Sequence, residues 1–247
     1  MKKISQKHYI EPDILLVSKP KGITSFDVIR KLRNILGIRK IGHAGTLDPL
    51  AHGLMIVGIA SGTKKMTSYL KLPKTYIAHI RIGVSTTTGD LEGEVVDEKV
   101  PHRNDMKEKD LEDVALSLVG PHTLQVPLYS AIKVQGKPLY EYARNNITPP
   151  YIPEKEMNIN DIQYLDSYRS GNYYVLSLRM SVSSGTYIRT IGELVGSKLG
   201  YPATLQGLYR VSIGKYLDKN AYKLKKKKFS HSSPLRAIIE WLFGKRS

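Results

Sequence analysis

Cysteine is absent from the 247-residue sequence, which excludes disulfide bonds, thiolate metal sites and cysteine nucleophiles. Long apolar runs are absent too, because no stretch approaches the roughly 20 residues that a membrane-spanning helix needs. The start of the chain has too short an apolar stretch for a secretory signal. These absences favour a cytoplasmic protein without a membrane segment.

Acidic residues are scarce, with 22 aspartates and glutamates against 38 lysines and arginines, and the formal net charge is +16. Such an excess indicates a polyanionic partner, most simply a nucleic acid. Part of the charge lies in the segment KLKKKKFSHSS near the C-terminus, which is either a solvated linker or an RNA-contacting tail. We place a domain boundary near residue 216, between a domain of residues 1–216 and a short basic extension of residues 217–247 with a possible helix after Pro234.

Apolar spacing predicts a buried strand at residues 14–18 and a helix within residues 24–37. The apolar residues of the helix recur with helical spacing: Phe26, Ile29, Leu32 and Ile35 or Leu36. Thr24 and Asp27 resemble a capping box at its start, and Gly37 is a stop signal at its end.

Later stretches predict more hairpins than regular alternation of strands and helices. The expected elements are an apolar stretch at 53–60, a helix capped by Ser61, a strand at 76–84, a helix at 106–120, a hairpin of 157–168 with 172–182, and a helix at 186–200. This order predicts an α+β fold with a mixed, mostly antiparallel sheet and flanking helices.

The loop KIGHAGTLDPLAHG, residues 40–53, concentrates glycines, two histidines and one aspartate. One interpretation is structural, because Asp48-Pro49 is an ordinary turn dipeptide. The other is functional, because glycines let another molecule approach the backbone and leave the Asp48 carboxylate on a constrained, reachable turn. Spacing alone does not decide between the two.

A metal site is a further alternative for this loop, since His43, Asp48 and His52 offer two imidazoles and one carboxylate. The spacing H-x4-D-x3-H matches no usual histidine-carboxylate motif, so we expect no metal. The segment GIASGTK also lacks the full pattern of a phosphate-binding loop.

Five stretches in collinear order resemble the TruB family of tRNA pseudouridine synthases, over roughly residues 10–217. They are KPKGITSFDV, GHAGTLDPLAHG, KTYIAHIRIGVSTTTGD, VPLYSAIKVQGKPLYEYAR and SSGTYIRTIGELVGSKLG. The resemblance implies the pseudouridine synthase fold and an isomerase that converts uridine 55 in the T-loop of tRNA to pseudouridine. The base would be flipped out of the RNA stack, and the reaction would need no cofactor.

The resemblance also implies roles for individual residues. Asp48 matches the essential carboxylate, which acts either as a nucleophile or as a base. Arg189 matches the arginine that pairs with this carboxylate, lowers its pKa and orients it. Tyr76 matches the tyrosine that stacks on the target base.

Further residues are expected to bind the RNA. His43 matches the loop that fills the space left by the flipped nucleotide, and Leu208 matches a leucine of the uracil pocket. The stretch 125–144 interleaves aromatic and basic residues and matches a loop that clamps the T stem-loop. The remaining expected contacts are Tyr129, Lys133, Tyr187 and Lys19, of which Lys19 either contacts phosphate or supports the catalytic loop.

The sequence departs from the family pattern in two places. His52 stands where the family usually has threonine, and the chain continues for only about thirty residues after the match. Three rival functions remain: a non-catalytic RNA-binding or RNA-folding protein, a metal-dependent nuclease, and a synthase acting on another RNA site. We expect a monomer.

Overall fold

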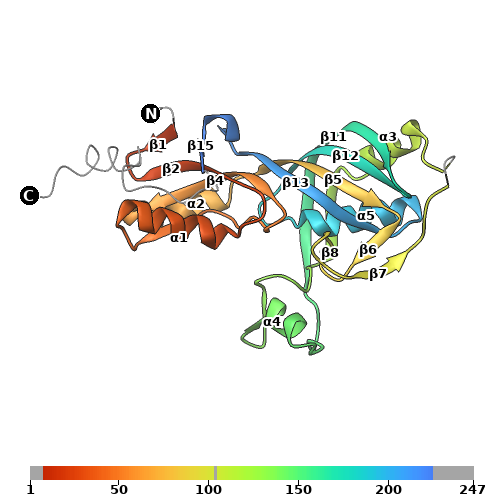
Figure 1. The fold of residues 1–247 in the computed structure, drawn as a ribbon, viewed down its shortest axis with the longest axis horizontal. Coiled ribbons are helices and arrows are strands. Elements are labelled where there is room, and N and C mark those ends of the chain that lie inside the picture. Colours follow the sequence, from red (N-terminus) through yellow and green to blue (C-terminus); the bar gives the residue numbers. More distant parts are fainter. Residues whose placement is uncertain (1–7, 103–104, 225–247) are drawn as a thin grey trace, which may run out of the picture. The chain divides into compact units, whose positions relative to one another are not determined.

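The structure is a computed structural model that describes residues 8–102 and 105–224. The chain forms two compact units. The first contains the described residues up to Thr75 and those from Tyr209 onward, and the second runs from Tyr76 to Leu208. Both units combine helices with a mostly antiparallel sheet (Figure 1), which confirms the predicted α+β class.

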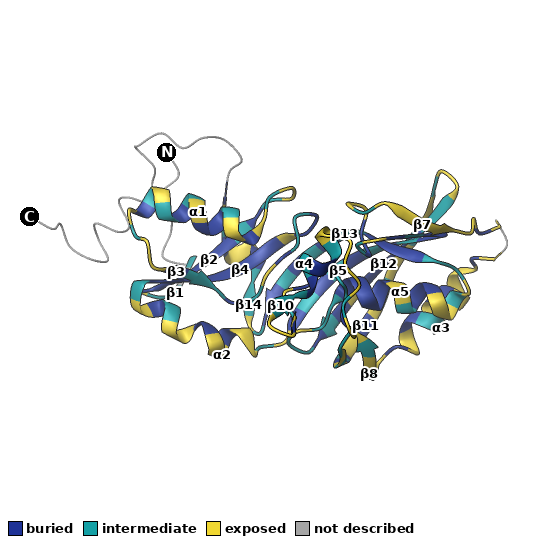
Figure 2. Cartoon of the chain, turned by 90° about the horizontal axis from the view of Figure 1, so that it is seen from below, coloured by how far each residue is buried: buried dark blue, intermediate teal, exposed yellow. Residues whose placement is uncertain are grey.

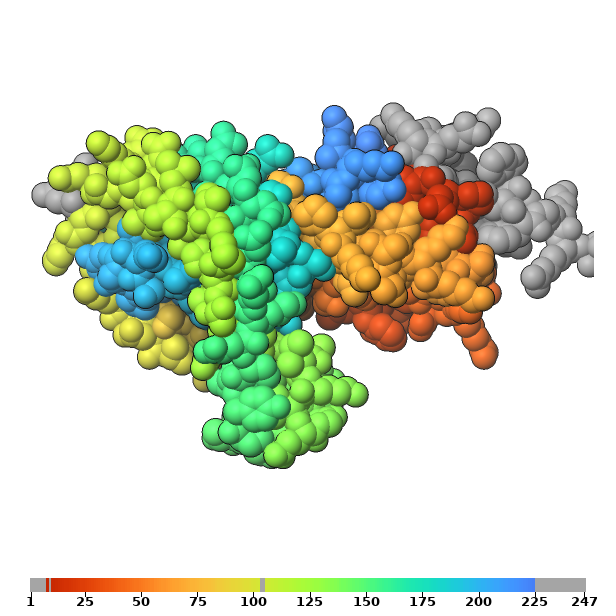
Figure 3. All heavy atoms as spheres, turned by 180° about the vertical axis from the view of Figure 1, so that it is seen from behind, coloured from red at the N-terminus to blue at the C-terminus, as the bar shows by residue number. Residues whose placement is uncertain are grey.

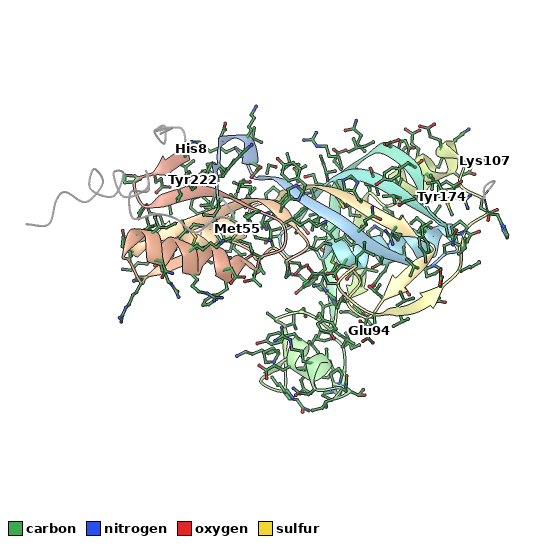
Figure 4. All side chains as sticks on the ribbon, viewed as in Figure 1. His8, Met55, Glu94, Lys107, Tyr174 and Tyr222 are labelled. Atoms are coloured by element: carbon green, nitrogen blue, oxygen red, sulfur yellow. The ribbon has the colours of Figure 1, made fainter. Side chains whose placement is uncertain are left out.

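In the first unit the strand order is β1, β2, β4 and the second half of β13, with β3 and β14 paired to β4 and β13. The strands are β1 (Tyr9–Glu11), β2 (Ile14–Lys19), β3 (Ile41–His43), β4 (His52–Ile59), β13 (Ala203–Ile213), β14 (Tyr216–Leu217) and β15 (Tyr222–Lys223). Most pairs are antiparallel, but β13 runs parallel to β4, and β15 runs parallel to β2. The apolar residues of β2 and β4 are fully buried, among them Met55, labelled in Figure 4.

Two helices cover opposite faces of this sheet, as Figure 2 shows. Helix α1 (Ser25–Leu36) begins at the predicted capping box of Thr24 and Asp27 and ends at Gly37, which is left-handed with φ 66°. Helix α2 (Met66–Leu70) packs its Met66 and Tyr69 against alternate residues of β2 and β4. The apolar strands of this unit are therefore buried on both faces.

In the second unit the first half of β13 is followed by β5, β12, β11 and β8. The strands are β5 (Lys74–Ile82), β6 (Val84–Thr86), β7 (Val95–Glu98), β8 (Gly120–Gln125), β9 (Lys133–Val134), β10 (Lys137–Pro138), β11 (Glu154–Ser170) and β12 (Tyr173–Val182). Every second residue of β5 is buried, as its alternating sequence predicts. The predicted hairpin is present as β11 and β12.

The helices of the second unit are α3 (Glu108–Leu116), α4 (Leu139–Arg144) and α5 (Ile188–Leu199). Helix α4 belongs to a segment, residues 126–152, that contains β9 and β10. We call it the α4 lobe, because in Figure 3 it stands off the rest of its unit. It is held mainly by its own small apolar cluster, in which Val126, Val134, Leu139 and Tyr142 pack with Met157 of β11.

Two local predictions were wrong. The helix expected to begin at a Ser61 cap instead opens with a 3-10 helix, η2 (Ala60–Lys65), and the Ser61 hydroxyl donates to Asp13 at 3.0 Å. Phe26, expected on the apolar face of α1, is 57% exposed. The basic run after Leu224 and the possible helix after Pro234 lie outside the described residues. No helix within the described ranges is long and apolar enough to cross a membrane.

Candidate active site

Residues 44–51, between β3 and β4, carry Asp48 on a tight turn, and we call them the catalytic loop after the role expected for Asp48. The carbonyl of Asp48 accepts a hydrogen bond from the Ala51 amide at 3.0 Å, and that of Pro49 accepts one from the Gly22 amide at 2.8 Å. Gly45 has φ 97°, which an L side chain rarely adopts, so glycine suits the first bend of the loop. Asp48 itself is half-buried.

The start of α1 fixes the residue next to Asp48. The Ser25 hydroxyl accepts a hydrogen bond from the Leu47 amide at 2.8 Å and donates one to the Leu47 carbonyl at 3.0 Å. Both side chains are buried. The backbone beside Asp48 therefore keeps one orientation.

Lys19 at the end of β2 is only 1% exposed, which is unusual for a lysine. Its ammonium donates to the carbonyls of Ile23 and Ala51, both at 2.6 Å, and at longer range to those of Pro20 at 3.2 Å and Pro49 at 3.4 Å. Of the two roles expected for Lys19, this geometry matches support of the catalytic loop. A phosphate contact does not fit a side chain buried to this extent.

Arg210 on β13 holds the other half of the catalytic loop and is also 1% exposed. Its guanidinium donates to the carbonyls of Leu54 at 2.6 Å, Gly45 at 3.1 Å and Thr46 at 3.3 Å. Arg210 was not among the residues predicted from the sequence. The available signal was its alternation with Leu208 and Ser212 along the strand, which places Arg210 on the same face as the buried Leu208, where a buried charge needs partners.

His43 ends β3 just before the catalytic loop. Burial is the main cause that lowers the pKa of its imidazole below the ordinary value near 6.5, and the positive charge of Arg210 lowers the pKa further. Among the described residues, its Nδ1 is buried without a hydrogen-bond partner. Both causes favour the neutral form of the ring, and its Nδ1 is a buried polar atom without a partner among the described residues.

His52, which departs from the family pattern, is exposed and begins β4. Its ring stacks on Tyr209 of β13 with a centroid distance of 4.7 Å and an interplanar angle of 9°. The Tyr209 hydroxyl donates to Asp218 at 3.0 Å, and burial together with this carboxylate raises the pKa of Tyr209 to about 12. The larger residue is accommodated by stacking.

In the second unit, Arg189 on α5 is 5% exposed. Its guanidinium donates to the carbonyl of Thr88 at 2.8 Å and to that of Tyr129 at 2.9 Å. Two backbone segments, one of them in the α4 lobe, therefore fix its orientation. Tyr76 on β5 and Leu208 on β13 are also buried in this unit, at 7% and 6% exposure.

The α4 lobe carries the interleaved aromatic and basic residues that the sequence singled out. Lys133 is exposed, Tyr129 is half-buried, and Tyr187, which precedes α5, packs against the apolar cluster of the lobe. Two cations lie over aromatic rings, Lys137 over Tyr142 at 4.7 Å and Arg144 over Tyr140 at 5.3 Å. Such a surface suits stacking and phosphate contacts.

The predicted site residues thus lie in both units. Lys19, His43 and Asp48 belong to the first, and the rest belong to the second: Tyr76, Tyr129, Lys133, Tyr187, Arg189 and Leu208. The pairing of Asp48 with Arg189 stays a prediction. Within the ranges that the structure describes, no group of three or more His, Asp or Glu side chains is arranged to hold a metal ion.

Comparison with known proteins identifies the family. Residues 33–188 match the family model described as "TruB family pseudouridylate synthase (N terminal domain)". A tRNA pseudouridine synthase B of Staphylococcus aureus (strain MSSA476) is 39% identical over 219 residues, which cover 88% of this chain and 72% of the relative. The protein of the same name from Bacillus subtilis (strain 168) is 40% identical over 204 residues, covering 82% of this chain and 65% of the relative.

Solved structures with the same fold include a Cbf5-Nop10-Gar1 complex, with a TM-score of 0.62 and 24% identity over 86% of this chain. An H/ACA RNP bound to a substrate RNA containing 2'-deoxyuridine gives a TM-score of 0.60 and 22% identity over 85% of this chain. This chain spans about half the length of both matched chains, 52% and 50%. With the catalytic loop and the matching curated relatives taken together, the chain belongs to the TruB family of pseudouridylate synthases, enzymes that isomerise uridine to pseudouridine.

Proposed function

We propose that this protein converts uridine 55 in the T-loop of tRNA to pseudouridine, with Asp48 as the essential carboxylate. The names of the curated relatives support tRNA as the substrate. The observation that carries the proposal is the fixation of the catalytic loop, in which Ser25, Lys19 and Arg210 bind the backbone on both sides of Asp48. A carboxylate held in this way acts without paying to reorganise its surroundings.

The reaction breaks the C1′–N1 bond of uridine, turns the uracil and forms a C1′–C5 bond. The proton at C5 is lost and N1 ends protonated, so the change is an isomerisation without oxidation or hydrolysis. Asp48 either attacks the nucleoside as a nucleophile or removes a sugar proton, and in both cases it acts as a carboxylate. Arg189, already oriented by two carbonyls, is the cation proposed to keep it ionised and aligned.

Binding of the flipped base is assigned to apolar and aromatic groups. Tyr76 stacks on the uracil, and Leu208 lines its pocket. His43 takes the space that the nucleotide vacates, and the flat face of an imidazole whose neutral form is favoured suits stacking on bases. The α4 lobe grips the T stem-loop. These contacts repay the few kcal/mol that extrusion of a base costs.

The test uses unmodified tRNA transcripts, purified wild type and Asp48→Asn, with site-resolved mapping of pseudouridine. Wild type is expected to form pseudouridine at the T-loop uridine in the presence of a chelator. Asp48→Asn is expected to lose at least about 10³-fold in rate, because asparagine is neither a nucleophile nor a base. The matched control is Asp161→Asn, an exposed aspartate on β11, which should keep the wild-type rate.

Each rival has its own outcome in this experiment. Wild type that binds tRNA but forms no pseudouridine would overturn the proposal in favour of RNA binding or folding. Pseudouridine at another position would show that the enzyme performs the same reaction at a different target uridine. Strand cleavage that the chelator abolishes would indicate the nuclease. Light scattering on the same samples checks the proposed monomer.

A further inference from the structure

The outward face of α1 has an exposed aromatic side chain where the helical spacing predicts a buried one. Phe26 is 57% exposed, whereas Ile29 and Leu32 of the same helix are buried. Figure 2 shows exposed residues along the outer side of α1. A single exposed apolar residue is ordinary, so the neighbours of the ring decide its meaning.

Two arginines flank this ring. The guanidinium carbon of Arg30 lies 5.7 Å from the Phe26 centroid, and that of Arg33 lies 5.6 Å from it. The three residues are spaced by four and three positions, which places them on one face of the helix. Figure 4 shows nitrogen-tipped side chains projecting from α1 away from the sheet. We call these three residues the α1 face.

The positive charge of this face is largely uncompensated. Between Lys21 and Lys40 the sequence has six basic residues and one acidic residue, Asp27. Asp27 already serves the capping box and pairs with Arg30 at 2.6 Å. Within the described residues, Arg33 makes no ion pair and no side-chain hydrogen bond, apart from its position over the ring. An exposed ring between cations is a surface for a polyanion with flat bases.

The α1 face begins next to the catalytic loop. Ser25, which binds the backbone of Leu47 beside Asp48, is directly followed by Phe26. The carbonyl of Ile23, just before the helix, is held by Lys19, which also holds Ala51 of the loop. The first turn of α1 and the turn of Asp48 are therefore parts of one fixed arrangement.

We propose that the α1 face contacts the RNA substrate close to the target nucleotide, with Phe26 stacking on a base or ribose and with Arg30 and Arg33 contacting phosphates. This inference rests on the proposed function, because the RNA is the substrate of that reaction. The α1 face, in the first unit, would be a second RNA contact besides the one proposed for the α4 lobe.

The arginines are tested by the salt dependence of tRNA binding. The double variant Arg30→Ala/Arg33→Ala is compared with wild type by equilibrium binding of an unmodified tRNA transcript at several salt concentrations. Each lost phosphate contact lowers the slope of log affinity against log salt by about 0.7 for a single strand and by about 0.9 for B-form duplex DNA, and a folded RNA is expected to give a similar value. The double variant is therefore expected to lower the slope by about 1.5 and the affinity about tenfold at low salt.

Arg169→Ala is the matched control, because Arg169 is also exposed and lies 5.8 Å from an aromatic ring, that of Tyr174. It should leave the slope unchanged. Phe26→Ala tests stacking and should weaken binding about fivefold or more with the slope kept, while Phe26→Tyr restores binding. Thermal unfolding of each variant is measured as well and should stay close to wild type, because Phe26 and Arg30 are exposed and Arg33 is only half-buried.

An unchanged slope in the double variant, or an equal loss in Arg169→Ala, would overturn the inference. Pseudouridine formation by wild type is measured on the same transcripts and reports separately on the proposed function. If wild type forms pseudouridine and the double variant leaves the slope unchanged, only the proposed RNA contact of the α1 face is overturned. If wild type forms no pseudouridine but the double variant lowers the slope, the proposed reaction is overturned and the RNA contact of the α1 face stands.

Discussion

The catalytic loop and the α4 lobe differ in what holds them. The backbone of the catalytic loop is bound by two cations, Lys19 and Arg210, each 1% exposed, and by the buried Ser25. The α4 lobe is held by a small apolar cluster and carries its cations on the outside, over aromatic rings. One region uses buried charge to fix the backbone, and the other carries its charge on the surface.

This difference matches two tasks. A reacting carboxylate needs a fixed geometry before the substrate arrives, and buried hydrogen bonds to carbonyls supply it. A surface that grips a folded RNA gains from adjusting to it, and a small cluster with few buried contacts opens at a lower free energy than the core of the sheet. Arg189 of α5 depends on the lobe for its own orientation, because its guanidinium donates to the Tyr129 carbonyl.

The largest effect is expected for the removal of Arg210, one of the two cations that bind the catalytic loop. Arg210→Met removes the donors to the carbonyls of Gly45, Thr46 and Leu54, and it leaves the buried Leu54 carbonyl without this partner. We expect a loss of about 3 kcal/mol in the free energy of unfolding. Because the loop also loses its orientation, kcat should fall more than KM rises. Urea unfolding and steady-state kinetics measure the two effects.

The control for this variant is Arg169→Met, which removes an exposed arginine and should change the stability by less than about 0.5 kcal/mol. Arg210→Lys keeps the charge but lacks the fork that reaches three carbonyls, so it should restore only part of the stability. An unchanged urea midpoint for Arg210→Met would show that the hydrogen bonds of Arg210 do not stabilise the catalytic loop. The proposed difference between the loop and the α4 lobe would then be wrong.

The next effect is confined to the lobe. Leu139→Ala removes a fully buried side chain from the small cluster and should lower the local free energy of opening by about 2–3 kcal/mol. Amide hydrogen exchange should accelerate in α4 and stay slow in β4. The matched variant Leu16→Ala in the first unit should instead lower the global stability. Equal acceleration in α4 and β4 after Leu139→Ala would show that the lobe does not open independently.

The smallest effect concerns pH. Because the pKa of His43 is lowered in the folded protein, the unfolded chain takes up this proton first as the pH falls. Stability should therefore decline as the pH falls through about 6.5 and level off below the folded pKa. His43→Gln should remove this part of the pH dependence, whereas His102→Gln, at an exposed histidine, should keep it.

The positive charge of Arg210, the second cause of the lowered His43 pKa, can be tested directly. Imidazole titration by NMR should give a higher His43 pKa in Arg210→Met than in wild type, since the positive charge of Arg210 opposes protonation. An unchanged His43 pKa would leave burial as the sole cause and would argue against a close influence of Arg210 on the start of the catalytic loop.

Much of the fold could be predicted because its signals are local. The capping box of Thr24 and Asp27 and the stop at Gly37 mark α1 within one residue, and alternation marks β5. The wrong start at Ser61 has a tertiary cause, because its hydroxyl binds Asp13, 48 positions away, and so does not cap a helix. Family motifs directed attention to Asp48 and Arg189, whose proposed roles remain to be tested.

The sequence by itself determined the charge, the order of elements and the family, since these depend on composition and on spacing along the chain. Only the tertiary structure decided that Lys19 and Arg210 are buried and bind the catalytic loop, through contacts 32 and 156 positions apart. It also decided that Phe26 is exposed. Helical spacing places a side chain on one face, but what packs against that face is set by distant parts of the chain.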